Sequence, residues 1–390
     1  MGLTGEGFLV LVIMGVLLLP LLTLLLWNRI PGPKVVKIGS RLSMILLSQT
    51  VAVLLAALCI NNTYQLYNSW SDLMGDNGST GSIQAATPQT TQSVTLGAKT
   101  DTRAGTQLPN AKLFSPLTGV QNTYQVQIKG SESKVVGTVL VWLPPQYFEA
   151  AYAHTKFPVI QLLSGSPGTP GTWLGGMQAP SLLENDVNEG MAHPFILVSA
   201  SINVDGRHDP DCSNIPGGPQ VATWLATDVR NLVETSYRVS ADRDGWGLMG
   251  YSEGGLCAAK LALQYSDEYA AAVSISGDDH PDGDLLKPGT AAYDENSPLW
   301  LLQHKPPVDE ALLLTGTQQD SDVAQEAAAM VRAAHNPTTV ATLISARGGH
   351  NIGVWKSVEP QSFEWLSQHL EAPSTSTYSA LSEMLGGVTG

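Results

Sequence analysis

The sequence is poor in positive charge. Its 390 residues include 20 Lys and Arg against 34 Asp and Glu, a formal net charge of −14. Proteins bind nucleic-acid phosphates and anionic lipid headgroups through Lys and Arg, so this composition argues against both kinds of partner. No Lys or Arg precedes Arg29, and a cleaved signal peptide would begin with a basic segment. The sequence also contains no internal repeat.

Two apolar stretches open the chain. Residues 8–27 form a run of 20 residues without a charge, enough for a helix that crosses about 30 Å of hydrocarbon. The second stretch, residues 44–60, is shorter and less apolar. The loop between them is basic, and the positive-inside rule therefore places it in the cytoplasm. We predict a membrane anchor of two transmembrane helices within residues 1–60, with the rest of the chain extracytoplasmic. The basic residues are Arg29, Lys34, Lys37 and Arg41.

The rest of the chain divides into three parts. Residues 61–112 are rich in Ser, Thr, Gln, Gly and Asn and predict a flexible linker, and residues 373–390 predict a flexible tail. Residues 113–372 alternate apolar strand patterns with helical ones, which predicts an α/β fold with a mainly parallel sheet between helices. Ligands of such sheets bind beyond the carboxyl ends of the strands. Strands are expected at 123–128, 135–141, 157–163, 195–201, 245–249, 271–276, 311–315 and 338–345, and helices at 220–237, 256–263, 323–334 and 360–370.

The motif that says most about function is Gly250-Tyr251-Ser252-Glu253-Gly254-Gly255. It lies between a predicted strand and a predicted helix, where Gly-x-Ser-x-Gly forms the nucleophile elbow of α/β hydrolases. Small residues at the flanking positions let the backbone turn sharply, so that the serine hydroxyl is exposed at the helix N-terminus. Ser252 is therefore the candidate nucleophile.

A serine hydroxyl needs a histidine as base, and the histidine needs a carboxylate that fixes its tautomer. Of the histidines after Ser252, His350 follows the last predicted strand and is flanked by glycines, which favours it as the base. The acid is expected after the preceding strand, where Asp320 and Asp322 both lie. Asp320 is the preferred acid. Asp322 stays an alternative, since an Asp there also suits the N-cap of the next helix.

The oxyanion of an acyl-transfer intermediate needs two preorganised donors. The backbone N–H of Glu253, directly after the nucleophile, is expected to be one. The N–H of Ser166, in the loop after the strand at 157–163, is expected to be the other.

Among the three cysteines, Cys59 lies in the second apolar stretch, and Cys212 and Cys257 lie in the main domain. Outside the cytoplasm a cysteine pair is more often oxidised than free. We therefore hypothesise a disulfide between Cys212 and Cys257 at the rim of the site, against the alternative of two buried thiols. The acidic loops at 208–211 and 277–284 lack the ligand spacing of a calcium loop. They are expected to be solvated rim loops, and no metal or cofactor is predicted.

Residues 120–371 resemble the esterase D-like branch of the α/β hydrolases, which includes the actinobacterial mycolyltransferases. The resemblance rests on three segments: residues 161–166, the elbow at 250–255, and Gly349-His350-Asn351 followed by Trp355. It implies Ser252 as nucleophile, His350 as base and an acid about 30 residues before the histidine, which points to Asp320. It also implies that the N–H groups of Ser166 and Glu253 bind the oxyanion.

The chain departs from the mycolyltransferases in the loop after the predicted strand at 157–163. Where they carry an Asp and an Arg, this sequence has Ser164 and Pro167. The departure argues against mycolyl transfer to trehalose. The sequence therefore predicts a membrane-anchored serine esterase acting on carboxylic esters. The alternatives are an acyltransferase of cell-envelope glycolipids and a non-catalytic envelope protein on a hydrolase scaffold. A peptidase would need an anchor for a peptide terminus, and the sequence identifies none.

Overall fold

The computed structural model describes residues 6–64, 67, 70–74, 84–85, 110–204, 206 and 208–375. The chain forms two compact units. The helical unit contains residues 1–79 and the two segments 317–321 and 346–354. The sheet unit contains residues 80–316, 322–345 and 355–390.

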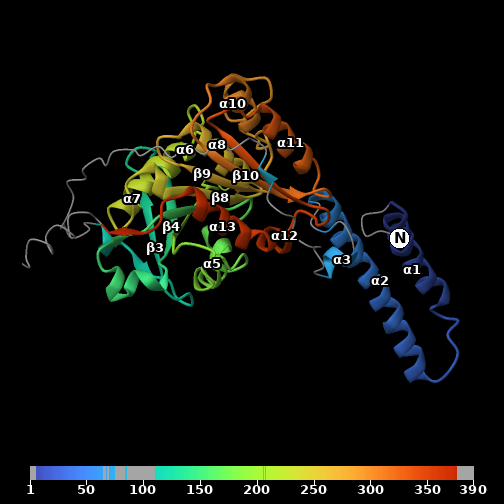
Figure 1. The fold of residues 1–390 in the computed structure, drawn as a ribbon. Helices are drawn as coiled ribbons and strands as arrows, with labels where there is room; N and C mark the ends of the chain where they lie inside the picture. Colours follow the sequence, from blue (N-terminus) through green and yellow to red (C-terminus); the bar gives the residue numbers. More distant parts are fainter. Residues whose placement is uncertain are drawn as a thin grey trace, which may run out of the picture. The chain divides into compact units, whose positions relative to one another are not determined.

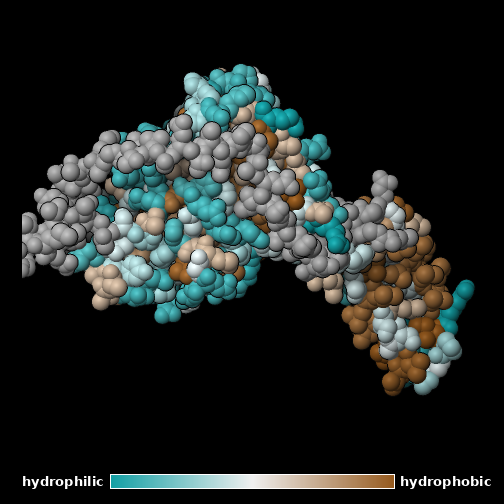
Figure 2. Space-filling view, viewed as in Figure 1, coloured by the Kyte–Doolittle hydropathy of each residue, from teal (hydrophilic) through white to brown (hydrophobic). Residues whose placement is uncertain are grey.

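Two long helices dominate the helical unit (Figure 1). Helix α1 spans Glu6–Leu26, α2 spans Lys34–Tyr64, and a short α3 spans Trp70–Leu73. Helices α1 and α2 pack around the buried side chains of Val12 and Leu58. Most of their other apolar side chains are exposed, and Figure 2 shows this hydrophobic covering in brown.

By length and composition, Gly7–Leu26 and Lys34–Asn61 are both able to span a membrane. The second helix begins ten residues before the predicted apolar stretch, because Lys and Arg are good helix formers and continue the helix. Lys34, Lys37 and Arg41 therefore lie in α2 and not in a loop. The Arg41 guanidinium donates hydrogen bonds of 3.1 and 2.8 Å to the main-chain oxygen of Trp27, which closes the turn between the helices.

Among the described residues, ten strands form the central sheet of the sheet unit, in the order β1-β11-β10-β9-β8-β6-β7-β4-β3-β2, where β1 is the short segment Gln84–Ala85. Strands β10, β9, β8, β6 and β7 are parallel, and antiparallel pairs extend the sheet from β7 to β2. The prediction of an α/β fold with a mainly parallel sheet is thus confirmed. The main strands are β2 (Ser115–Pro116), β3 (Thr123–Lys129), β4 (Val136–Trp142), β6 (Val159–Leu163), β7 (Ile196–Ala200), β8 (Trp246–Tyr251), β9 (Ala271–Ile275), β10 (Ala311–Thr317) and β11 (Thr339–Ser345).

Helices lie between the strands at the four predicted positions and also at positions that the sequence did not predict. They are α4 (Pro170–Leu174), α5 (Ala179–Asn188), α6 (Val221–Thr223), α7 (Arg230–Glu234), α8 (Glu253–Gln264), α9 (Ala291–Asp294), α10 (Pro298–His304), α11 (Val323–Ala333), α12 (Ile352–Ser357) and α13 (Glu359–His369). A π-helical turn over Trp224–Val229 joins α6 to α7. The long helix predicted at 220–237 is therefore one helical segment of three parts.

Helices cover both faces of the sheet. Every residue of β6, β7, β8, β9 and β10 is buried, as expected for parallel strands packed on both sides. In β8, a Cβ on Gly247 would meet Leu366 and Leu370, at the end of α13, whereas a Cβ on Gly250 would meet α8. Because successive strand residues face opposite sides, α8 and α13 lie on opposite faces (Figure 1).

The predicted linker and tail differ from the structure at their ends. Helix α2 continues to Tyr64, α3 follows, and β1 (Gln84–Ala85) pairs with β11 at the edge of the sheet. Strand β12 (Ser374–Thr375), at the start of the predicted tail, pairs with β5 (Thr155–Lys156). Strand β1 joins the edge of the large sheet, whereas β5 and β12 form a separate two-stranded sheet. Such short segments pair through main-chain hydrogen bonds, which composition does not reveal. The rest of the predicted tail, residues 376–390, lies outside the described residues, as does most of the predicted linker.

Candidate active site

Ser252 occupies a strained turn between β8 and α8. Its φ of 57° and ψ of −128° lie outside the regions that an L-residue normally adopts, and such strain is concentrated at functional sites. The Ser252 N–H donates to the main-chain oxygen of Ile275 on β9, and its carbonyl accepts from Gly255 and Leu256 of α8. The serine is thus held by the sheet on one side and by the helix on the other.

Two glycines make this turn sterically feasible. A Cβ on Gly250 would collide with the main chain of Gly254, and a Cβ on Gly254 would collide with the main chain of Leu163 at the end of β6. The helix therefore begins directly against the sheet, and its N-terminal N–H groups lie beside the serine. This is the elbow that the sequence motif predicts.

The loop after β6 lies against the elbow. A Cβ on Gly165 would be 2.8 Å from the Cβ of Ser252. Within the loop, Ser164 Oγ donates to the Thr169 carbonyl at 2.8 Å, and Gly168 N–H donates to the Gly165 carbonyl at 2.6 Å. Ser166 is exposed at the tip of this fixed loop. The loop that carries the predicted Ser166 donor is therefore adjacent to the nucleophile.

A stack of aromatic side chains around Tyr251 packs against the same loop. The Tyr251 ring stacks on Trp355 at a centroid distance of 4.6 Å and contacts Trp173 at 5.3 Å. A Cβ on Gly168 would be 2.7 Å from the Tyr251 hydroxyl, so the tyrosine fills the space beneath the loop. These contacts fix the relative positions of β8, α4 and the loop between β6 and α4.

The predicted acid and base are paired within the helical unit. His350 Nδ1 lies 3.0 Å from Asp320 Oδ1 and 3.1 Å from Oδ2. The Asp320 side chain is 1% exposed and that of His350 is 25% exposed. A buried carboxylate at Nδ1 orients the imidazole and favours the tautomer that carries its proton on that nitrogen.

Hydrogen bonds join the two loops that carry this pair. Thr317 Oγ1 donates to the Gly348 carbonyl at 2.7 Å, and the Gly348 N–H donates to Gln319 Oε1 at 3.2 Å. Asp322, the alternative acid, is exposed at the N-terminus of α11, where Gln325 donates to it weakly at 3.5 Å. The structure therefore brings Asp320, and not Asp322, to the histidine.

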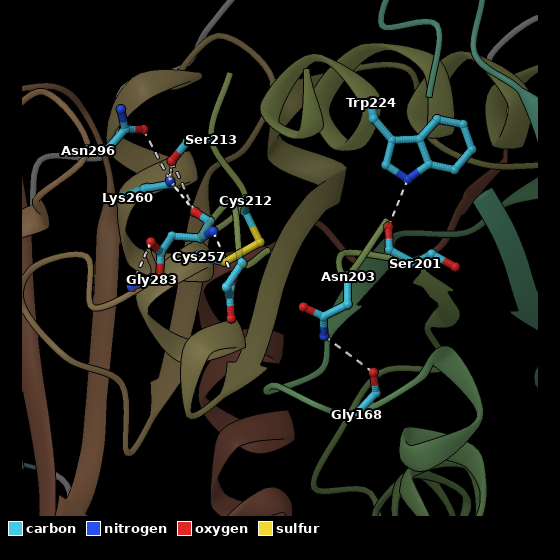
Figure 3. The surroundings of a disulfide bond; sticks show 12 residues. Gly168, Ser201, Asn203, Cys212, Ser213, Trp224, Cys257, Lys260, Gly283 and Asn296 are labelled. Carbon is cyan, nitrogen blue, oxygen red and sulfur yellow. Dashed lines mark hydrogen bonds between the residues drawn. A yellow bond between two sulfur atoms is a disulfide. The ribbon is translucent and has the colours of Figure 1, made fainter. Parts of the chain in front are cut away.

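A disulfide joins Cys212 to Cys257, with Cα atoms 5.7 Å apart (Figure 3). It ties the loop after β7 to the second turn of α8. The same loop is held by Lys260 of α8, which is fully buried and donates to the Asp211 main-chain oxygen, to Ser213 Oγ and, at 3.1 Å, to Asn296 Oδ1. Burial lowers the pKa of Lys260. The loop after β7 is thus anchored to the helix that carries the nucleophile.

Sequence reasoning missed the buried side chains behind the elbow. Lys260 stands alone among apolar residues of α8, which is a signal for a buried partner. For Glu253 the sequence predicts only a main-chain role, yet its side chain is 5% exposed. Burial, and next the Asp209 carboxylate, raise the pKa of Glu253 well above its usual value. Local sequence does not show this environment, because loops more than twenty residues away form it.

Comparison with known families decides the affiliation. The sequence model of the Esterase family matches residues 134–379, more than half of the chain. The chain belongs to the Esterase family.

One sequence relative and two solved structures are similar to this chain. An uncharacterized protein of Corynebacterium glutamicum is 23% identical over 245 residues, which cover 58% of this chain and 56% of that protein. The chain therefore matches little more than half of its relative's length. A ferulic acid esterase superposes with a TM-score of 0.55 at 20% identity, covering 64% of this chain and 98% of its own. S-formylglutathione hydrolase from Agrobacterium tumefaciens superposes with a TM-score of 0.55 at 14% identity, and the match covers 66% of this chain and 98% of that one. At such identities the likeness shows the fold alone.

Proposed function

We propose that this esterase is a membrane-anchored serine hydrolase that cleaves carboxylic esters through an acyl-serine intermediate. The observation that carries the proposal is the backbone of Ser252, a strained turn between a buried parallel strand and a helix N-terminus. Strain of this kind presents a hydroxyl group for attack and is retained where function requires it. Membership of the Esterase family supports the same reaction class.

In the proposed mechanism His350 Nε2 takes the proton of the Ser252 hydroxyl as the oxygen attacks the ester carbonyl. Asp320, held at Nδ1, keeps the imidazole in the required tautomer and stabilises the imidazolium that forms. The register of the sheet supports this assignment. Strands β8 and β10 are both parallel to β9 between them, so the chain leaves both strands at the same edge of the sheet.

The negative charge that develops on the carbonyl oxygen would be stabilised by the N–H groups of Glu253 and Ser166. Support comes from the first turn of α8, which begins with Glu253, and from the contact of the Gly165 loop with Ser252. Removing one such donor typically costs about 3 kcal/mol of transition-state stabilisation. Because both donors are main-chain groups, side-chain substitution would leave them in place.

We further propose that α1 and α2 anchor the esterase in a membrane with its catalytic domain outside the cytoplasm. The apolar side chains of these helices are mostly exposed, whereas a core helix of a soluble protein would bury them. Arg29, Lys34, Lys37 and Arg41 gather around the turn between the helices, which favours a cytoplasmic turn.

Water is the acceptor that we propose for the acyl group. Ser164 and Pro167 occupy the positions at which the mycolyltransferases carry an Asp and an Arg, so support for a sugar acceptor is weak in this loop. Transfer to a sugar hydroxyl would appear as an acylated sugar when the acyl-enzyme is formed in the presence of trehalose.

The test is hydrolysis of p-nitrophenyl acyl esters by the full-length protein in detergent. The wild type should release p-nitrophenol, and Ser252→Ala should reduce the rate to background, because alanine has no oxygen that can form the acyl-enzyme. Undiminished hydrolysis by the variant would rule out the acyl-serine mechanism. Inactivity of the folded wild type toward every ester tried would favour a non-catalytic envelope protein.

A further inference from the structure

Tyr251, the residue directly before Ser252, lies beneath the loop that follows β6. Its side chain is 3% exposed. A Cβ on Gly165 would be 3.0 Å from the Tyr251 ring, and a Cβ on Gly168 would be 2.7 Å from the tyrosine hydroxyl oxygen. Both distances are shorter than ordinary van der Waals contact, so the main chain of this loop packs directly on the tyrosine. Ser166, the proposed oxyanion donor, lies between the two glycines.

Gly165 is a point at which this loop contacts the elbow. In the described part of the chain, and apart from the neighbours of Gly165 itself, the three atoms nearest to such a Cβ belong to Ser252 and Tyr251. The distances are 2.8 Å to Ser252 Cβ, 3.0 Å to the Tyr251 ring and 3.1 Å to the Tyr251 main-chain oxygen. Tyr251 therefore helps to hold the loop next to the nucleophile.

The Tyr251 hydroxyl adds polar contacts to this packing. Burial raises the pKa of Tyr251. Hydrogen bonds with the hydroxyls of Ser164 and Thr172 and with the Gly165 main chain oppose this rise in pKa. Ser164 and Gly165 begin the loop, whereas Thr172 lies in α4, which follows it. One hydroxyl group therefore interacts with both ends of the segment that contains Ser166.

Two tryptophans fix the orientation of the Tyr251 ring. Trp355 stacks on it at a centroid distance of 4.6 Å and an interplanar angle of 22°, and Trp173 contacts it at 5.3 Å. Aromatic pairs at these separations favour a defined geometry. A ring in contact with two aromatic side chains keeps its hydroxyl group in one position.

The far end of the loop has hydrogen bonds that do not involve Tyr251. The Thr169 N–H donates to Thr172 Oγ1 at 3.1 Å, and Asn203 Nδ2 donates to the Gly168 carbonyl at 3.4 Å (Figure 3). Removal of the tyrosine hydroxyl therefore leaves these bonds in place and loosens the end of the loop that contacts the nucleophile.

We infer that Tyr251 is a positioning residue for the reaction: its hydroxyl group holds the loop after β6 so that the Ser166 N–H binds the oxyanion together with the Glu253 N–H. The inference rests on the proposed esterase function and assigns a role to the x position before the serine in Gly-x-Ser-x-Gly. Loss of one complete oxyanion donor lowers kcat by about 10²- to 10³-fold. A donor that is displaced but not removed should lower kcat by less, on the order of tenfold.

The experiment measures hydrolysis of p-nitrophenyl butyrate by full-length Tyr251→Phe in detergent. Phenylalanine keeps the ring and its stacking but lacks the hydroxyl. We expect kcat to fall by about tenfold with KM unchanged, because the oxyanion exists in the transition state and not in the bound ester. Ser164→Ala removes one partner of the same hydroxyl and should give a smaller loss of kcat, again at constant KM.

A transition-state analogue separates positioning from a general effect on stability. An aliphatic trifluoromethyl ketone would form a hemiketal with Ser252. The serine oxygen bonds to the carbonyl carbon, the hydroxyl proton moves to His350, and the carbonyl oxygen becomes the oxyanion. The Ki of this ketone should rise in Tyr251→Phe by the same factor by which kcat/KM falls. The Ki of the corresponding methyl ketone, which binds largely unreacted, should stay constant.

Tyr147→Phe is the matched control. The Tyr147 hydroxyl accepts a hydrogen bond of 3.1 Å from the Arg238 N–H, and its ring contacts Phe157, which precedes β6, at a centroid distance of 5.5 Å. It therefore lies at the opposite end of β6 from the loop. Loss of this hydroxyl should leave kcat and both Ki values unchanged, whatever its effect on Tm.

The outcomes distinguish the inference from the proposed function. Unchanged kcat and Ki in a folded Tyr251→Phe, or a loss of the same size in Tyr147→Phe, would overturn the inference and leave the esterase function intact. An equal rise in KM and in the Ki of the methyl ketone would also overturn it, since the tyrosine would then shape the binding of the ground state. For a Tyr251→Phe that does not fold, the same criteria apply to Ser164→Ala. If the wild type neither hydrolyses the ester nor binds the trifluoromethyl ketone more tightly than the methyl ketone, the esterase function itself is contradicted.

Discussion

At the scale of single residues, Asp320 is the most informative side chain of the candidate site, because it pairs with His350. Its carboxylate is buried, and both of its oxygens lie within 3.1 Å of His350 Nδ1. Such a carboxylate both orients the imidazole and stabilises its charged form. Asp322, two residues later, is exposed and lies at the start of α11.

Asp320→Asn should lower kcat for p-nitrophenyl ester hydrolysis by about 10³- to 10⁴-fold, because an amide at this position favours the wrong tautomer of His350. For Asp322→Asn, the matched control, kcat should stay within a few-fold of the wild-type value. Steady-state kinetics of both variants measures this difference. A larger loss in Asp322→Asn than in Asp320→Asn would reverse the assignment.

Glu359 is a second informative carboxyl group, remote from the elbow. Its side chain is fully buried, and among the described residues neither carboxylate oxygen has a hydrogen-bond partner. Burial raises its pKa well above the usual value, with a smaller lowering by Lys356 and a smaller raising by Asp186. The folded state therefore keeps a proton that the unfolded state loses above about pH 4.5.

Because the pKa of Glu359 is raised in the folded state, its contribution to stability is complete at low pH and decreases as pH rises. The free energy of unfolding of Glu359→Gln should therefore equal that of the wild type near pH 4. As pH rises to alkaline values, the variant should become the more stable protein, by up to about 1.4 kcal/mol per pH unit. Urea unfolding across this range measures the difference. Glu364→Gln, exposed on the same helix, is the control, and a pH-independent effect at Glu359 would contradict the explanation.

The sequence singles out Ser252 and His350 as candidates because a short local pattern marks each of them. It left the acid open, since Asp320 and Asp322 follow the same strand and only the fold of the loop selects between them. The environments of Glu253 and Lys260 could not be predicted, because segments distant in the sequence form them. The lone Lys in an apolar helix was the one signal available.

At the scale of elements, the disulfide ties the loop after β7 to α8 and closes a loop of 45 residues. Its partners are Cys212 and Cys257. Cross-links of this length restrict the unfolded chain and stabilise a protein by about 4 kcal/mol.

Cys212→Ser combined with Cys257→Ser should lower Tm by on the order of 10 °C, and a reducing agent should have the same effect on the wild type. Cys59→Ser, in α2, is the control and should leave Tm unchanged. Differential scanning calorimetry of the detergent-solubilised protein makes the measurement. Titration of two further thiols in the unreduced, denatured wild type would contradict the disulfide.

Strands were the most predictable elements, since buried parallel strands give continuous apolar runs such as those of β6 and β9. The short strands β1 and β12 could not be predicted from the sequence. Gln84–Ala85 and Ser374–Thr375 pair through main-chain hydrogen bonds, and their polar composition instead favoured flexible segments.

At the scale of the whole molecule, the proposed arrangement is an apolar helical hairpin followed by an acidic catalytic domain. The net charge of −14 suits a domain in water. The orientation of the hairpin is an independent prediction, made from the basic residues near its turn.

A fusion of alkaline phosphatase after Thr63 should be active, and a fusion after Gly32, in the turn, should be inactive, because this reporter works only outside the cytoplasm. Fusions of β-galactosidase at the same positions should show the opposite pattern. Equal expression of the fusions is checked by immunoblot. An active cytoplasmic reporter after Thr63 would contradict the proposed topology.

The measurement that tests the central proposal most directly is the mass of the active-site peptide after reaction with a fluorophosphonate. The account predicts one adduct, on Ser252, with labelling lost in Ser252→Ala and strongly slowed in Asp320→Asn. Absence of an adduct from the folded wild type, or an adduct on another residue at the same rate in Ser252→Ala, would contradict the account.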